Sequence, residues 1–153
     1  MEKYTEVIGR KLNAILEKTY DAEKGFGKAA ENCEVRSLAT WFNERALDRH
    51  RFINELKREI NAFGEGYKDN GTLAGDAHRT WMDIKSLFSK DHAEAMLEEA
   101  IRGEKVALEE YKEVLKEKDL PRSTIALLTS QMAQIDYGLA LIMGVKDLDY
   151  EKQ

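Results

Sequence analysis

The chain has 153 residues, with 24 Lys and Arg against 29 Asp and Glu, a formal net charge of −5, one cysteine and one proline. This length suits a single domain. The acidic balance argues against a nucleic-acid partner, which needs a basic face, and one cysteine excludes a disulfide framework. No apolar run approaches the roughly 20 residues of a bilayer span, and the first residues do not read as a signal peptide. We therefore expect a cytoplasmic protein without a membrane partner.

The first half of the chain shows the apolar spacing of amphipathic helices, with steps of three or four residues. This spacing predicts a helix over about residues 3–30, and the polar stretch 31–34 then forms a short turn. A second helix is predicted over 38–63. It should end where Gly64 and Gly66 interrupt the pattern, because glycine readily adopts positive φ.

The second half begins with an irregular, glycine-rich stretch at 64–71, followed by a shorter amphipathic piece at 73–88. A third long helix is predicted from about residue 92 up to the turn before Pro121. Proline suits the first turn of the next helix, where its missing N–H has no intrahelical partner to lose. The last apolar stripe runs over 125–142 and predicts the fourth helix.

Four long helices with short turns after the first and third make two antiparallel hairpins. The long connection between the hairpins can cross the length of a bundle. The sequence therefore predicts an all-α, ferritin-like four-helix bundle with one long crossover that carries a short extra helix. An irregular five-helix bundle is the alternative. We expect one domain over 1–146 and a frayed polar tail over 147–153.

Polar side chains interrupt the apolar stripes of all four predicted helices. Counting residues from the turns places most of them near one level of the bundle, so we expect a buried polar core layer. Its predicted members, which are also the candidate binding site, are Glu23, Arg45, Arg49, Glu104, Gln131 and Gln134.

A buried carboxylate layer in such a bundle suggests a metal site. Di-iron bundles take a Glu from each of two helices and a Glu-x-x-His pair from each of the other two. None of the three histidines here has that pair, and the cation of Arg49 would repel a metal while neutralising carboxylates itself. We therefore expect a structural Arg–Glu–Gln network, no catalytic residue and no cofactor. The alternative is iron or zinc bound by Glu23, His50, Glu99 and Glu104.

The chain resembles, over essentially its whole length, an uncharacterised bacterial family of ferritin-like four-helix bundles that is catalogued as a domain of unknown function. The resemblance rests on the stretches 21–26, 49–56, 75–83 and 102–111. The fourth helix matches least, since Gln134 stands where the family carries an acid. The resemblance implies the fold and supplies no established reaction. Only the wider ferritin-like grouping implies iron chemistry, by analogy of fold.

Two further features carry candidate chemistry. The most specific stretch of the resemblance holds a crossover motif of His78, Arg79, Trp81 and Asp83. It could form an anion pocket closed by Trp81, but we favour an anchor for the short helix, because an aromatic on a helical stripe is usually core. The lone Cys33 precedes a helix, whose dipole could lower the thiol pKa.

The first functional interpretation is a non-catalytic bundle that acts by binding or assembly in a stress or maintenance role. We expect a homo-oligomer, most simply a dimer. The second interpretation is a carboxylate-bridged metal oxidase or metal-storage protein. A third is a small-molecule binder with a pocket under Trp81.

Overall fold

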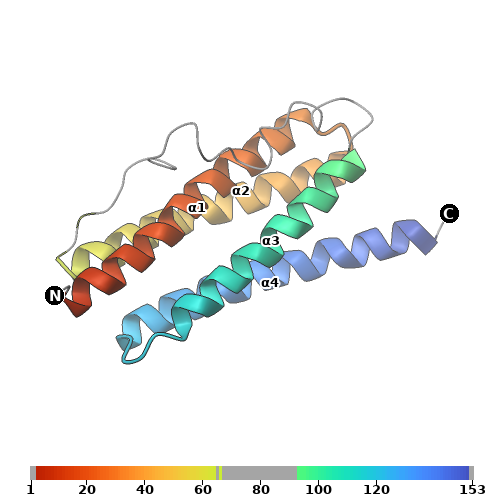
Figure 1. Ribbon diagram of the computed structural model, residues 1–153. Coiled ribbons are helices and arrows are strands. Elements are labelled where there is room, and N and C mark those ends of the chain that lie inside the picture. Colours follow the sequence, from red (N-terminus) through yellow and green to blue (C-terminus); the bar gives the residue numbers. More distant parts are fainter. Residues whose placement is uncertain (1–2, 65, 67–92, 152–153) are drawn as a thin grey trace.

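The computed structural model describes residues 3–64, 66 and 93–151, with side chains described up to residue 144. These residues form four helices and no strand (Figure 1). The helices are α1 (Tyr4–Asn32), α2 (Arg36–Ala62), α3 (Ala93–Leu115) and α4 (Arg122–Glu151). The prediction of an all-α four-helix bundle is confirmed.

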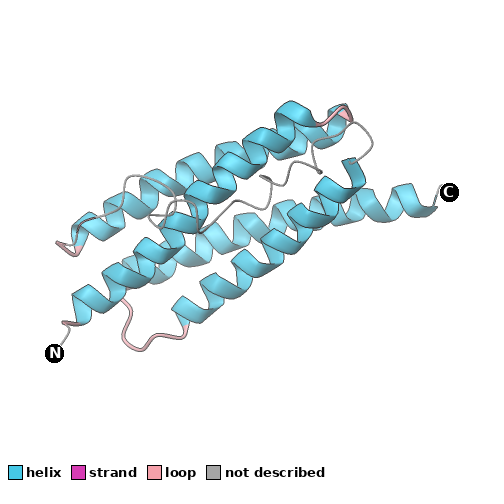
Figure 2. Cartoon of the chain, turned by 45° about the horizontal axis from the view of Figure 1, so that its top comes forward, coloured by secondary structure: helices cyan, strands magenta, loops and turns pink. Residues whose placement is uncertain are grey.

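The helices pair as two antiparallel hairpins, α1 with α2 and α3 with α4 (Figures 1 and 2). Contacts between α1 and α3 and between α2 and α4 join the hairpins. Because α2 ends and α3 begins at opposite ends of the bundle, these two helices run in the same direction (Figure 1). The predicted crossover requires this arrangement. The short helix expected within 73–88 lies outside the described residues.

The helix ends follow the residues that interrupt the apolar pattern. After α2 ends at Ala62, Gly64 has φ of +76°, a conformation in which a glycine avoids the steric cost of a Cβ. In the turn after α3, Asp119 also takes a positive φ of +60°. Pro121 stands just before α4, and its carbonyl accepts the first bond of that helix from Ile125 N–H at 3.0 Å.

Three side-chain hydrogen bonds hold together the same end of the bundle. The Tyr4 hydroxyl of α1 donates to the Lys118 carbonyl in the α3–α4 turn at 2.8 Å. On α4, the hydroxyls of Ser123 and Thr124 both donate to one carboxylate oxygen of Glu59, each at 2.7 Å. The start of α4 is thereby held against the last turns of α2.

The fourth helix differs from expectation in two ways. Its backbone remains helical to Glu151, within the segment 147–153 that we expected as a frayed tail. Its stretch Arg122–Gly144 is also long and apolar enough to cross a bilayer, and a third of its most apolar window is buried in the bundle. By length and composition alone, this stretch is the one such candidate among the described residues.

The apolar core divides into two clusters along the bundle axis. The first contains residues near the start of α1, the end of α2 and the α3–α4 turn, including Leu12, Leu56 and Leu128. The second contains residues near the α1–α2 turn, including Phe26 and Phe42. Buried polar side chains lie along each of the four helices between or beside these clusters, namely Thr19, Arg45, Arg49, Glu104 and Gln131.

Candidate functional site

The centre of the site is an ion pair between Arg49 of α2 and Glu104 of α3. Arg49 Nη1 donates to Glu104 Oε2 at 2.9 Å, and Nη2 donates to Oε1 at 2.5 Å. Their side chains are only 3% and 2% exposed. This two-pronged geometry matches a planar guanidinium to a carboxylate and is among the strongest ion-pair arrangements in proteins.

Aromatic rings from both apolar clusters surround the Arg49 guanidinium. Its central carbon lies 5.4 Å from the ring centre of Phe26 and 5.8 Å from that of Phe52. Burial acts to lower the pKa of Arg49, but the charge and hydrogen bonds of Glu104 outweigh it and raise that pKa. The guanidinium therefore stays charged, with its positive charge balanced by one carboxylate.

A second polar group lies farther along the bundle, around the fully buried amide of Gln131 on α4. Its oxygen accepts from the Tyr111 hydroxyl at 2.6 Å, and its nitrogen donates to Glu55 Oε1 at 3.0 Å and to the Phe52 carbonyl at 3.4 Å. Burial raises the pKa of Tyr111 well above its ordinary value, against the lowering effect of the Arg49 charge. The phenol is therefore a stable hydrogen-bond donor. Gln131 thus links α4 to both α2 and α3.

Tyr111 was not among the predicted site residues, although it lies seven residues after Glu104 on the same face of α3. Seven residues are nearly two helical turns, so the two side chains point the same way. Tyr111 counted as one more apolar stripe position, yet its hydroxyl needs a partner when the ring is buried. The signal was its alignment with Glu104 and the presence of a buried amide on α4.

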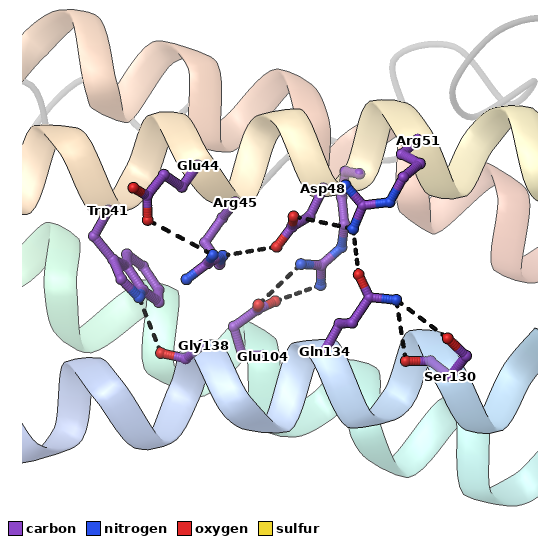
Figure 3. Close-up of polar contacts among 10 residues, drawn as sticks. Trp41, Glu44, Arg45, Asp48, Arg51, Glu104, Ser130, Gln134 and Gly138 are labelled. Atoms are coloured by element: carbon purple, nitrogen blue, oxygen red, sulfur yellow. Dashed lines mark hydrogen bonds and ion pairs between the residues drawn. The ribbon is translucent and has the colours of Figure 1, made fainter.

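Arg45, one turn before Arg49 on α2, is also buried but is bound differently (Figure 3). Its Nε donates to Asp48 of the same helix at 3.1 Å, and its Nη2 lies 3.9 Å from the Glu44 carboxylate. Its Nη1 has no hydrogen-bond partner among the residues that the structure describes. The guanidinium instead lies over the Trp41 ring, with 5.5 Å from its carbon to the ring centre.

Gly138 of α4 makes room for the Arg45 side chain. A Cβ built at Gly138 would lie 2.6 Å from Arg45 Nη1 and 3.0 Å from its central guanidinium carbon. The Gly138 carbonyl also accepts a hydrogen bond from the Trp41 indole at 2.9 Å (Figure 3). A glycine inside a helix usually weakens it, and here it permits the close approach of two α2 side chains.

Two predicted members of the buried layer lie at the surface of the bundle instead. Gln134 is part-exposed, accepts from Arg51 and donates to the Ser130 carbonyl at 3.2 Å. Glu23 is also part-exposed, and its carboxylate lies 2.9 Å from Nδ1 of the exposed His50. The prediction of one buried layer with all six members is therefore wrong for Glu23 and Gln134.

The physical reason is the direction of each side chain around its helix. A helix turns about 100° per residue, so a residue three positions along points about 60° away. Gln134 stands three residues after the buried Gln131, and Glu23 stands three residues before the buried Phe26. Both fall at the edge of the core-facing side, at the correct height but outside the core.

The four residues of the alternative metal site do not converge on one point. Glu104 is bound by Arg49, and Glu23 contacts His50 at the surface. Glu99 accepts a hydrogen bond from Arg102 Nε at 3.0 Å on α3. Within residues 3–64, 66 and 93–144, no three His, Cys, Asp or Glu side chains gather as a metal site would require.

An open groove of about 520 Å³ runs between α2 and α4, beside Arg45 and Asp48. Its lining side chains are Arg45, Asp48, Ser130, Ala133, Gln134 and Tyr137. Both basic and acidic groups face the groove, so it presents no single charge to a ligand.

Two other candidates have separate outcomes. The crossover motif of His78, Arg79, Trp81 and Asp83 lies outside the described residues. For Cys33, burial raises the thiol pKa against a smaller lowering by a backbone hydrogen bond at Val35, so the lowering that the helix dipole could cause is not found. A raised thiol pKa keeps the sulfur protonated and argues against a nucleophilic role.

The sequence profile described as domain of unknown function DUF2383 matches residues 7–117. The chain belongs to this family. The match covers nearly all of α1, all of α2 and α3, and both partners of the Arg49–Glu104 pair. It ends before α4, which carries Gln131 and Gly138. No curated protein matches the chain.

Proposed function

We propose that this DUF2383 protein is a non-catalytic, ferritin-like bundle that acts by binding or assembly, with an internal salt bridge where such bundles hold metal. The observation that supports this most directly is that Arg49 donates to both oxygens of Glu104. A carboxylate must offer free oxygen lone pairs to bind an ion at close range. The Glu104 carboxylate directs both oxygens to a guanidinium instead.

Charge supports the same proposal. A divalent cation beside Glu104 would lie within a few ångströms of the permanently charged Arg49, at a depth where repulsion is weakly screened. Binding would require that side chain to leave a pocket made by Phe26 and Phe52. The pair therefore takes a structural role, and the surface of the bundle is left to carry the function.

The competing metal-binding function is tested by elemental analysis. The full chain is produced with added iron and zinc, purified without chelators, and measured for metal per chain, alongside Glu104→Ala and Glu23→Ala. We expect traces far below one ion per chain in all three proteins. A full equivalent in the wild type that both substitutions remove would overturn the proposal.

A matched variant controls for an effect of folding. Glu109→Ala removes a carboxylate from the same α3 helix without touching the buried pair or any predicted metal ligand, since the exposed Glu109 pairs with Lys112. Circular dichroism shows whether each variant keeps its helical content. Metal that is bound by the wild type and lost with Glu104→Ala, but retained in a folded Glu109→Ala, would place an ion at Glu104.

A further inference from the structure

The outward face of α4 carries a regular stripe of exposed residues. They are Arg122, Ala126, Thr129, Ala133, Asp136 and Ala140, and we call them the α4 outer stripe. Their spacing alternates between four and three residues, which is the seven-residue repeat by which one helix packs along another. Four of the six side chains are small, so another helix can approach closely.

Exposed apolar side chains flank this stripe. Ile125, Tyr137 and Leu141 are 44%, 67% and 46% exposed, which makes α4 the main source of exposed large apolar residues on the described part of the chain. Ala133 also belongs to the wall of the groove between α2 and α4. The apolar surface therefore continues from the stripe into the groove, as expected of a surface that another molecule covers.

The charges of α4 select the partner. Arg122 and Asp136 are the only charged residues in Arg122–Gly144, and both lie in the α4 outer stripe. They stand seven residues on either side of Thr129. Neither forms an ion pair with any other residue that the structure describes.

A two-fold axis through Thr129 would bring these two charges opposite each other in a pair of α4 helices. When a second α4 lies antiparallel with the two helices crossing at Thr129, each Arg122 faces Asp136 of the other copy. The contact is made twice, as in an isologous two-fold interface. A parallel second α4 would place like charges side by side, which opposes association.

We propose that the α4 outer stripe is the dimer interface of this protein, occupied by the same stripe of a second copy in antiparallel orientation. This inference rests on the proposed function, since it gives the assembly role its partner and surface. The interface uses no residue of the Arg49–Glu104 pair. A metal analysis that contradicts the proposed function is therefore distinguishable from an association measurement that contradicts the interface.

Charge reversal tests the interface directly. The full chain and its variants are compared by analytical ultracentrifugation across a dilution series. In the Arg122→Glu variant, a glutamate would lie opposite Asp136 of the other copy, so two negative charges would repel. In the Asp136→Arg variant, an arginine would lie opposite Arg122 of the other copy, so two positive charges would repel. We expect each single variant to raise the dimer dissociation constant about tenfold or more, and the double variant R122E/D136R to restore dimerisation.

Lys105→Glu is the matched control, because it makes the same change of charge at an exposed position of α3. We expect it to leave the dimer intact. A wild type that is monomeric throughout the series would overturn the proposal, as would a dimer that both single reversals leave unchanged. So would a monomer that binds neutral lipid vesicles through α4, since the surface would then have another occupant.

Cross-linking tests the crossing point and the orientation. In a Cys33→Ser background, Thr129→Cys places two thiols at the symmetry axis, and we expect a disulfide-linked dimer under mild oxidation. Ala140→Cys lies eleven residues from the axis in each copy, so its two thiols are separated by about 33 Å at 1.5 Å per residue. Efficient cross-linking through residue 140, or none through residue 129, would contradict the antiparallel arrangement.

Discussion

Two buried arginines, one turn apart on α2, meet their charge requirements in different ways. Arg49 reaches across the bundle to Glu104 on α3, and its neighbours are aromatic rings. Arg45 pairs with Asp48 on its own helix, and its Nη1 beside Gly138 has no hydrogen-bond partner in the described part of the chain. The first arginine links two helices. The ion pairs of the second are made within α2 itself.

The environment of each carboxylate sets the cost of removing its arginine. The Glu104 side chain is 2% exposed, so the loss of Arg49 would leave a negative charge in the core. The Asp48 side chain is 20% exposed and also pairs with Arg51 at 3.2 Å. Water and a second cation would therefore still stabilise Asp48 after the loss of Arg45. A buried charge is costly mainly when its partner is taken away.

The largest effect is expected from Arg49→Leu. This substitution leaves Glu104 buried and unpaired, so we expect the free energy of unfolding to fall by about 3–5 kcal/mol at neutral pH. Urea denaturation followed by circular dichroism measures this change. An unfolding midpoint equal to that of the wild type would show that the ion pair does not hold the core together.

The double variant R49L/E104L separates two effects on stability. One is the cost of leaving Glu104 unpaired, and the other is the contribution of the ion pair itself to the free energy of unfolding. Replacing both charges with apolar groups removes the unpaired carboxylate and its desolvation cost. We therefore expect the double variant to recover most of the stability lost in Arg49→Leu. Equal destabilisation in both would mean that Arg49 contributes by its shape and not by its charge.

A smaller effect is expected from Gly138→Ala, which tests how closely Arg45 is held. The new methyl group would overlap the guanidinium, and overpacking of this kind costs about 1–3 kcal/mol. Against it stands a gain of about 1 kcal/mol in helix propensity. We expect a net loss of stability in thermal and urea melts.

Two controls sharpen this result. A Cβ at Gly27 on α1 would meet no described atom within 4 Å, so Gly27→Ala keeps only the propensity gain and stability should rise. In an Arg45→Ala background the overlap at residue 138 disappears, and Gly138→Ala should then become stabilising. The same loss of stability with and without Arg45 would show that the close approach has no energetic consequence.

The smallest effect is expected from Arg45→Met. It removes an ion pair to a part-exposed aspartate, worth about 0–1 kcal/mol, and a cation–π contact with Trp41 worth about 0.5–2 kcal/mol. It also removes the unpartnered Nη1 and keeps an unbranched stem in the same space. We expect a net loss of about 1 kcal/mol or less by urea denaturation. A loss of stability as large as that of Arg49→Leu would show that the two arginines contribute equally to the stability of the bundle.

The helices could be predicted from the sequence because their signals are local. The apolar spacing predicted all four helices. Gly64 and Pro121 lie at the helix boundaries that their backbone chemistry predicts. Arg49 and Glu104 were found for a related reason, since a charge in the middle of an apolar stripe is visible without a structure.

The site was harder to predict because its membership depends on direction around each helix. Counting from the turns gives the height of a residue in the bundle, but a rotation of about 60° separates the buried Gln131 from the part-exposed Gln134. Tyr111 and Trp41 escaped notice because their rings count as apolar while their polar atoms bind across helices. Such partners become visible only when two helices are placed side by side.

The two apolar clusters on either side of the Arg49–Glu104 pair constrain how the hairpins can slide past one another. Apolar side chains alone tolerate a shift of α3 along α2 by one turn, about 5.4 Å, because one aliphatic contact replaces another. The same shift would break both hydrogen bonds between Arg49 and Glu104 and take the buried carboxylate away from the guanidinium that it matches. A single charged contact between the clusters therefore fixes the axial alignment of two helices that are far apart in the sequence.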